Sequence, residues 1–114
     1  DAATTYVISG VIDNISTAAT VYIPTPEAGT VKQVTTVLGG TIATSAVAVV
    51  VKNAAAATMG TITVNDAGSA AGDIDSVTPS TNNTFTANSF VTIDTDGAST
   101  NTVKLYFSLL VERS

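Results

Sequence analysis

The stretch TVKLYFSLLVE, residues 102–112, decides the fold class of this chain. Its odd-numbered positions are all apolar, whereas its even-numbered positions include a lysine, a serine and a glutamate. Because side chains alternate between the two faces of a strand, this period of two predicts a β-strand with one fully apolar face. The other face carries Tyr106 and Leu110, which is more apolar surface than a solvent-facing side needs.

Shorter β-rich segments fill most of the remaining chain. Prolines at 24 and 26 are expected to end one of them, and the apolar pattern of residues 30–38 slips at Val34, which predicts a β-bulge. An alanine-rich helix is the alternative for residues 43–59, but the valine run and the lack of charged pairs one turn apart favour a strand. The predicted strands cover residues 4–13, 20–23, 30–38, 46–52, 61–64, 90–94 and 102–112, and loops cover 54–57 and 66–88, with a short strand near 74–77.

The length of 114 residues matches one domain, so we expect residues 1–114 to form a single unit. Seven or more short strands without an amphipathic helix predict an all-β fold with antiparallel strands, a β-sandwich or a barrel. The inward positions expected on three of the central strands are Val47, Val49 and Val51, then Ile62 and Val64, then Val91 and Ile93. The chain contains no cysteine, so no disulfide holds this core.

Three missing residue types limit the chemistry of the chain. There is no histidine, cysteine or tryptophan, so the usual proton shuttle, the thiolate nucleophile and the soft ligands of zinc and copper are absent. Lys32, Lys52 and Lys104 lie in or beside predicted strands without a partner motif for a serine–lysine nucleophile. The composition therefore predicts a protein that is not an enzyme and has no cofactor.

Charge and hydropathy narrow the choice of partner. The formal net charge is −5 and the four basic residues are scattered, which disfavours nucleic acid. The longest apolar run, residues 46–51, is far shorter than the roughly 20 residues of a membrane-spanning helix. Only 11% of the residues are charged, so a weakly charged surface favours contact with other protein. The alternative is that the many Thr and Ser hydroxyls serve only to keep the surface hydrated.

Two acidic pairs are candidate metal ligands. The sequence Asp94-Thr95-Asp96-Gly97 resembles the start of a calcium loop, but the expected glutamate further along is missing. The same residues are typical of a hairpin turn, which is the interpretation we favour. Asp73 and Asp75 form the second pair, next to a small-residue segment, 68–72, that we expect to pack closely against another surface.

Three stretches together resemble one group of proteins: VYIPTPEAGTVKQVTTVLGGTI (21–42), GTITVNDAGSAAGDIDSVTP (60–79) and NSFVTIDTDGASTNTVKLYFSLLVER (88–113). They look like the small head decoration, or cement, proteins of tailed bacteriophages. The resemblance implies a β-sandwich of jelly-roll type on the outer capsid surface of the virion. It further implies a structural role that bridges major capsid protein subunits, and a homo-oligomer, with a trimer favoured and a dimer possible.

Four outward apolar residues are the expected subunit contacts: Tyr22, Val50, Tyr106 and Leu110. Residues 1–5 are expected to form an extended arm that reaches across the capsid, because a polar terminus of small residues docks at low cost. The alternative function is a carbohydrate-binding or adhesin-type β-sandwich of a fibre or cell-surface assembly, since one fold serves many functions.

Overall fold

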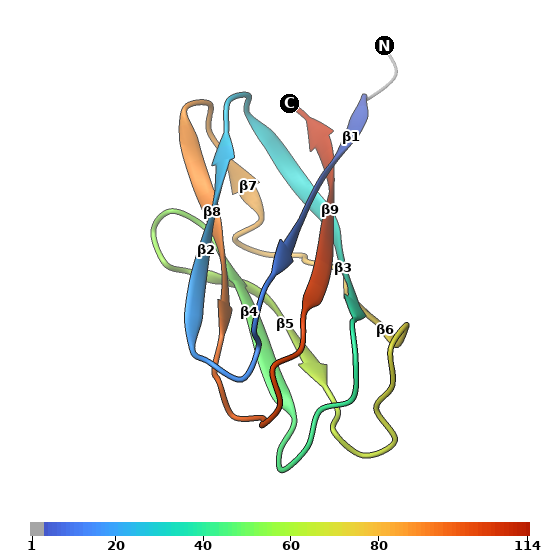
Figure 1. Ribbon diagram of the computed structural model, residues 1–114. Coiled ribbons are helices and arrows are strands. Elements are labelled where there is room, and N and C mark those ends of the chain that lie inside the picture. Colours follow the sequence, from blue (N-terminus) through green and yellow to red (C-terminus); the bar gives the residue numbers. More distant parts are fainter. Residues whose placement is uncertain (1–3) are drawn as a thin grey trace.

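The computed structural model describes residues 4–114 and consists of two antiparallel β-sheets packed face to face (Figure 1). The predicted all-β sandwich is therefore confirmed. The strands are β1 (Thr5–Ile12), β2 (Ala19–Thr25), β3 (Gly29–Leu38), β4 (Val47–Lys52), β5 (Thr58–Val64), β6 (Ile74–Val77), β7 (Thr84–Phe85), β8 (Ser89–Thr95) and β9 (Leu105–Arg113).

Strands early in the chain pair with strands late in the chain, and the pairs are nested around the β4–β5 hairpin. β4 pairs with β5, β3 with β6, β2 with β8 and β1 with β9, all antiparallel. Two more pairs, β3–β9 and β4–β8, connect these strands into two sheets. Sheet A has the strand order β1-β9-β3-β6, and sheet B has the order β2-β8-β4-β5. Sheet A has a fifth strand, β7, which also pairs with β3, and the two sheets with this connectivity form a jelly roll, as the resemblance implied.

The core lies between the sheets and is almost entirely aliphatic. Every inward position predicted for β4, β5 and β8 is buried, and Val47, Val49 and Val51 are completely so. The odd-numbered residues from Val103 to Val111 are buried as well, which confirms the apolar face of the last strand. Phe85 and Phe107 are the aromatic residues of this core. Gly10 lies directly on Phe107, because a Cβ at that glycine would be 2.7 Å from the ring.

Irregular features of the strands confirm one sequence prediction and correct two others. The bulge in β3 is confirmed, between Val31 and Gln33. β2, however, continues through Pro24 to Thr25, since an edge strand tolerates a missing N–H. The segment 66–88 holds the expected strand β6 and also the unexpected β7, and both pair with β3.

The N-terminal residues that were expected to form an arm are only partly described by the structure. Residues 1–3 of the expected arm lie outside the described residues. Thr5 already begins β1, and the Thr4 carbonyl accepts a hydrogen bond from the Arg113 N–H (2.9 Å), so this part of the expected arm is held along sheet A. Among residues 4–114 no helix could cross a membrane.

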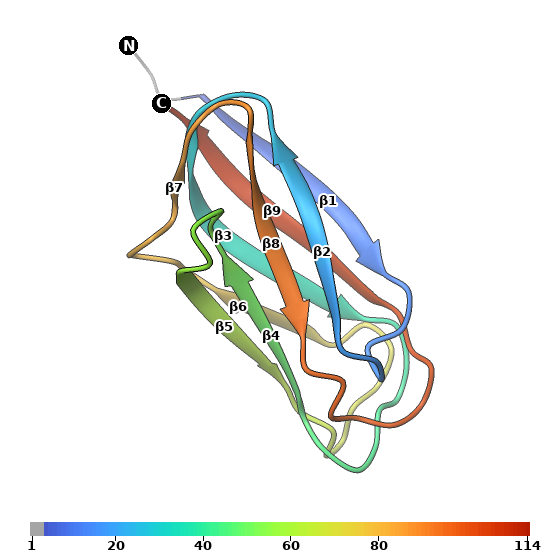
Figure 2. The same ribbon diagram turned by 90° about the vertical axis from the view of Figure 1, so that its left-hand side faces the viewer.

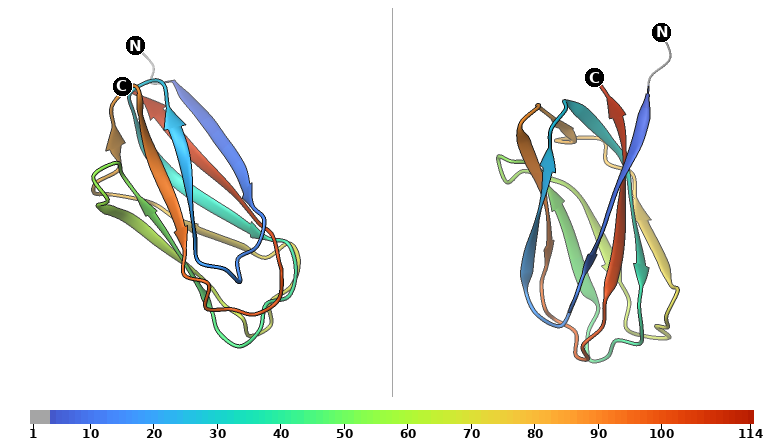
Figure 3. Two further views of the ribbon diagram at one scale, coloured as in Figure 1. Left: turned by 60° about the vertical axis from the view of Figure 1, so that its left-hand side comes forward. Right: turned by 45° about the horizontal axis from the view of Figure 1, so that its top comes forward.

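Four loops gather at the end of the sandwich opposite to the C-terminus (Figures 1 and 3). They cover residues 13–18, 39–46, 65–73 and 96–104, and we call them the loop end. The Ser69 hydroxyl is buried there and bonds both the N–H and the carbonyl of Ile42 (3.0 Å each). The small-residue segment 68–72 thus packs against a neighbouring loop, as the sequence predicts.

Candidate functional site

The outer face of sheet A, which we call the A face, carries a row of apolar side chains across β1, β9, β3 and β6. Val11 of β1 lies opposite Tyr106 of β9, Tyr106 lies opposite Val37 of β3, and Val37 lies opposite Ile74 of β6. Val11, Tyr106 and Ile74 are 42%, 48% and 69% exposed. The register therefore aligns four apolar residues in a band that the sandwich itself does not bury.

Two further rows extend this face without a charge. The second row, at the next outward position of each strand, consists of hydroxyl side chains: Ser9, Ser108, Thr35 and Ser76. The third row is largely apolar and consists of Val7, Leu110 and Gln33. Removing such a surface from water leaves no ion without its hydration shell, so another protein can cover the A face at a low desolvation cost.

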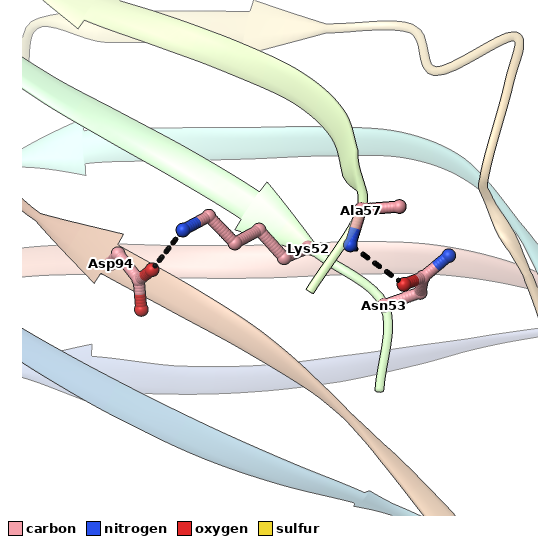
Figure 4. A network of polar contacts seen from close by, with 4 residues as sticks. All are labelled: Lys52, Asn53, Ala57 and Asp94. Carbon is pink, nitrogen blue, oxygen red and sulfur yellow. Dashed lines mark hydrogen bonds and ion pairs between the residues drawn. The ribbon is translucent and has the colours of Figure 1, made fainter. Parts of the chain in front are cut away.

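The outer face of sheet B, which we call the B face, has an ion pair in the middle. Lys52 Nζ lies 3.0 Å from Asp94 Oδ2, on the neighbouring strands β4 and β8 (Figure 4). Beside it Tyr22 and Phe90 form an edge-to-face aromatic pair with ring centroids 5.4 Å apart. A shallow depression runs between the ion pair and this aromatic pair. A partner that covers the B face has to desolvate two charges.

The turn next to the B face is fixed by one asparagine. Asn53 Oδ1 accepts hydrogen bonds from the N–H groups of Ala55 and Ala57, both 3.0 Å long. Figure 4 shows the bond from Ala57. Its Nδ2 donates to the carbonyl of Asn82, and the Nδ2 of Asn82 donates to the carbonyl of Thr58. The β4–β5 turn is therefore tied to the segment between β6 and β7, which gives the depression a defined rim.

The four residues expected from the sequence as contacts do not form one site. Tyr106 and Leu110 lie on the A face, whereas Tyr22 and Val50 lie on the B face, on the opposite side of the sandwich. Tyr22 is 66% exposed, and Val50 and Leu110 are half-buried.

Sequence reasoning did not select the other apolar members of the A face, Val7, Val11 and Ile74, as contacts. The alternation of β1 was a signal for Val7 and Val11, because apolar residues occupy both faces of that strand and the two valines share the outward one. Ile74 lies in a segment that the sequence marks mainly as a loop, so no periodic signal points to it.

Three of the four residues of the acidic pairs have structural partners within the chain. Asp94 pairs with Lys52, and Asp96 Oδ1 accepts a hydrogen bond from the Ala98 N–H (3.1 Å) in a turn where Gly97 has a φ of 69°. The Asp-Gly turn is therefore confirmed, but the hairpin is wrong, because this connection leads from β8 in sheet B to β9 in sheet A. Asp73 Oδ2 accepts from the Ala70 N–H (2.9 Å). Within residues 4–114 no three acidic side chains cluster as a metal site.

Comparison with known proteins rests on structure, since no family model and no curated protein matches this chain. The fold is similar to a chain in the acidic stable capsid structure of Helicobacter pylori bacteriophage KHP30, with a TM-score of 0.62 and 25% identity, covering 95% of this chain and 86% of that one. It is also similar to a chain in the capsid asymmetric unit of cyanophage Pam1, with a TM-score of 0.59 and 20% identity, covering 98% and 86%. The expected resemblance to phage capsid proteins is confirmed. The class is a jelly-roll sandwich of the kind present in phage capsids.

Proposed function

We propose that this protein is a structural component of a phage virion that decorates the outer surface of the head and cements it by bridging major capsid protein subunits. The observation that carries the proposal is the set of three uncharged and partly apolar rows on the A face, which the sandwich leaves open. The similarity to the KHP30 capsid chain supports it, because that similarity covers nearly all of both chains. The matched chain is therefore a small capsid component of about the same size.

The A face suits a permanent contact with a protein shell. The central parts of stable interfaces are depleted in charged residues and enriched in aromatic ones, and here Tyr106 lies on an inner strand of the apolar row. We assign Tyr106 and Leu110 to the shell contact, together with Val11, Val37 and Ile74. The proposed role is not enzymatic, and it needs no cofactor.

The charge of the chain favours the outer side of the shell over the DNA side. Most of the net charge of −5 comes from the loop end, where Asp13, Asp66, Asp73 and Asp96 lie near a single lysine, Lys104. Packaged DNA is a dense polyanion, so a protein with this charge is repelled from it. In this proposal residues 1–114 act as one unit, and partners are the major capsid protein and further copies of the chain.

Binding to heads that lack the protein tests this function. Purified chain is added to particles of its phage from which it has been deleted or stripped, and the bound amount is measured after sedimentation. We expect saturation at a fixed number of copies per head and a higher temperature of DNA release. Absence of saturable binding would contradict the proposal.

A second candidate function follows from the B face. Tyr22 is largely exposed beside Phe90, and the hydroxyls and the Lys52–Asp94 pair line the same depression, an arrangement of aromatic and polar groups that also suits a sugar ring. A glycan array distinguishes this adhesin-type role: specific binding that Tyr22→Ala removes would favour it over the capsid role.

A further inference from the structure

β1 differs from the edge strands β2, β5 and β6, and from the two-residue β7, in having no feature that prevents strand pairing. Sheet edges in natural proteins are usually protected by proline, charge, a bulge or shortness. β2 contains Pro24, β5 has a register shift against the end of β4, and β6 has four residues including Asp75. β1 has eight residues, TYVISGVI, without proline, charge or bulge, and one side of it pairs with β9 over its full length. Its other side has no partner among residues 4–114 and lies open in Figures 1 and 2.

We propose that a second copy of this chain pairs with the open edge of β1, antiparallel and centred on Ser9. The sequence of β1 suits this arrangement, because a two-fold axis at Ser9 places Val7 of one copy opposite Val11 of the other. Both valines point outward and are 61% and 42% exposed. The inward residues then place Ile8 opposite Gly10, a bulky residue opposite the smallest one. The edge is therefore complementary to itself in side-chain size and in polarity.

The charge distribution favours the antiparallel arrangement. Two copies with a net charge of −5 repel each other, and most of this charge belongs to the loop end. The opposite end balances Glu27 and Glu112 against Arg113 and Lys32. An antiparallel pair along β1 brings the loop end of one copy beside this balanced end of the other. The two acidic loop ends are then separated by the length of the molecule.

The size of the contact sets its expected strength. Eight residues extend about 26 Å, and the smallest dimension of the molecule is 21 Å. A contact that spans the thickness of the sandwich covers about 550 Å² on each copy, at the lower end of specific interfaces. We therefore expect a concentration-dependent dimer with a dissociation constant in roughly the micromolar range. Neighbouring copies on a particle are held at a high effective concentration, which strengthens such a contact.

Pairing along β1 has a consequence for the A face. The apolar row from Val11 to Ile74 continues into the row that begins at Val7 of the second copy, and the hydroxyl rows of both copies join at Ser9. Two A faces become one continuous surface of eight strands. This last step rests on the proposed function: a dimer with two adjoining A faces can bridge two capsid subunits, whereas a monomer has only one.

A pair of serines at opposite ends of the same row tests the contact. Ser9 on β1 and Ser76 on β6 are both exposed and belong to the hydroxyl row. Ser9→Lys is expected to raise the dimer dissociation constant in analytical ultracentrifugation at least about tenfold, because the two lysines lie opposite each other. Ser76→Lys is the matched control and is expected to leave the dissociation constant unchanged.

A cross-link gives a second readout that does not depend on destabilising the strand. Facing residues of antiparallel strands have Cα atoms about 4.5–5.5 Å apart, which is within the range of a disulfide. The chain has no cysteine of its own, so Ser9→Cys is expected to form a covalent dimer on mild oxidation at low concentration, and Ser76→Cys is not. A wild-type protein that stays monomeric up to roughly millimolar concentration, a trimer, or equal behaviour of the Ser9 and Ser76 variants would overturn the proposal.

The head-binding experiment separates this proposal from the proposed function. If the wild type dimerises through β1 but does not bind heads, only the capsid role fails. If it binds heads with saturation but Ser9→Lys and Ser76→Lys sediment alike, only the β1 contact fails.

Discussion

The A face and the B face share the same strand geometry but differ in what a partner has to remove from water. Three successive rows of the A face hold apolar residues, hydroxyls and one amide, and Tyr106 lies on an inner strand of the apolar row. The centre of the B face is the Lys52–Asp94 pair, which is about a quarter to a third exposed. Covering the A face therefore costs little desolvation, whereas covering the B face removes water from two charges.

This difference shows that the two sides of one sandwich can have separate functions. The inner faces of both sheets are equally aliphatic, because both contribute to the same core. Selection on the fold alone gives no reason for Val11, Tyr106 and Ile74 to be exposed in one band. A contact with another protein does, and the predictions below test whether that contact belongs to the A face.

A charge in the apolar row of the A face is expected to have the largest effect. Tyr106→Lys and Tyr106→Glu should each weaken head binding by at least about 100-fold, or about 2.7 kcal/mol, because an unpaired charge has to be buried. Thr61→Lys on the B face is the matched control, since Thr61 is exposed in the row of Val50. Equal loss of binding by Thr61→Lys would contradict the assignment. Thermal unfolding of all three variants shows whether the fold is intact.

A buried hydroxyl allows stability to be changed without altering either face. Thr36 points into the core from β3, and its Oγ1 is buried without a hydrogen-bond partner. Thr36→Val should therefore raise the free energy of unfolding by about 1 kcal/mol and leave head binding unchanged. Thr35→Val, the outward neighbour, is expected to change stability by less than about 0.5 kcal/mol. A loss of stability in Thr36→Val would show that the hydroxyl has a bonding role.

Removal of the ion pair on the B face should have a smaller effect. The pair is partly solvated, so Asp94→Asn is expected to lower the free energy of unfolding by about 0.5–1 kcal/mol at low salt. The difference from the wild type should shrink at 1 M salt, where the Debye length is about 3 Å. Head binding is expected to stay at the wild-type level. Weakened binding at unchanged stability would move the contact to the B face.

The smallest effect is expected at Tyr22, which is the most exposed aromatic residue among residues 4–114. Tyr22→Ala should change head binding by less than about twofold, because truncation outside an interface has little effect on affinity. The same variant, tested on a glycan array, decides whether the exposed ring has the second candidate function.

The sequence predicted the inner faces well because alternation within one strand determines which residues are buried. Val47, Val49 and Val51 are an example, and the bulge near Val31 was visible as a break in the same pattern. The A face could not be predicted in this way. Val11 and Tyr106 become neighbours only through the pairing of the first strand with the last.

Other errors have the same physical origin. The Asp96–Gly97 turn was expected to join two paired strands, but turn chemistry is local and does not reveal that the chain crosses from sheet B to sheet A. Pro24 was expected to end its strand, but it lies on an edge, where a missing N–H costs no ladder bond. Tyr22, Val50, Tyr106 and Leu110 were recognised as outward residues, but their division between two faces depends on the topology.

Single-cysteine labelling tests most directly whether the A face is the contact surface. Tyr106→Cys and Tyr22→Cys each introduce the sole thiol of a chain without cysteine, one on each face. Both thiols should react with a maleimide in the free protein. On decorated heads we expect Tyr106→Cys to be protected and Tyr22→Cys to react as before. A thiol at position 106 that remains reactive on the head, with protection at position 22, would contradict the account.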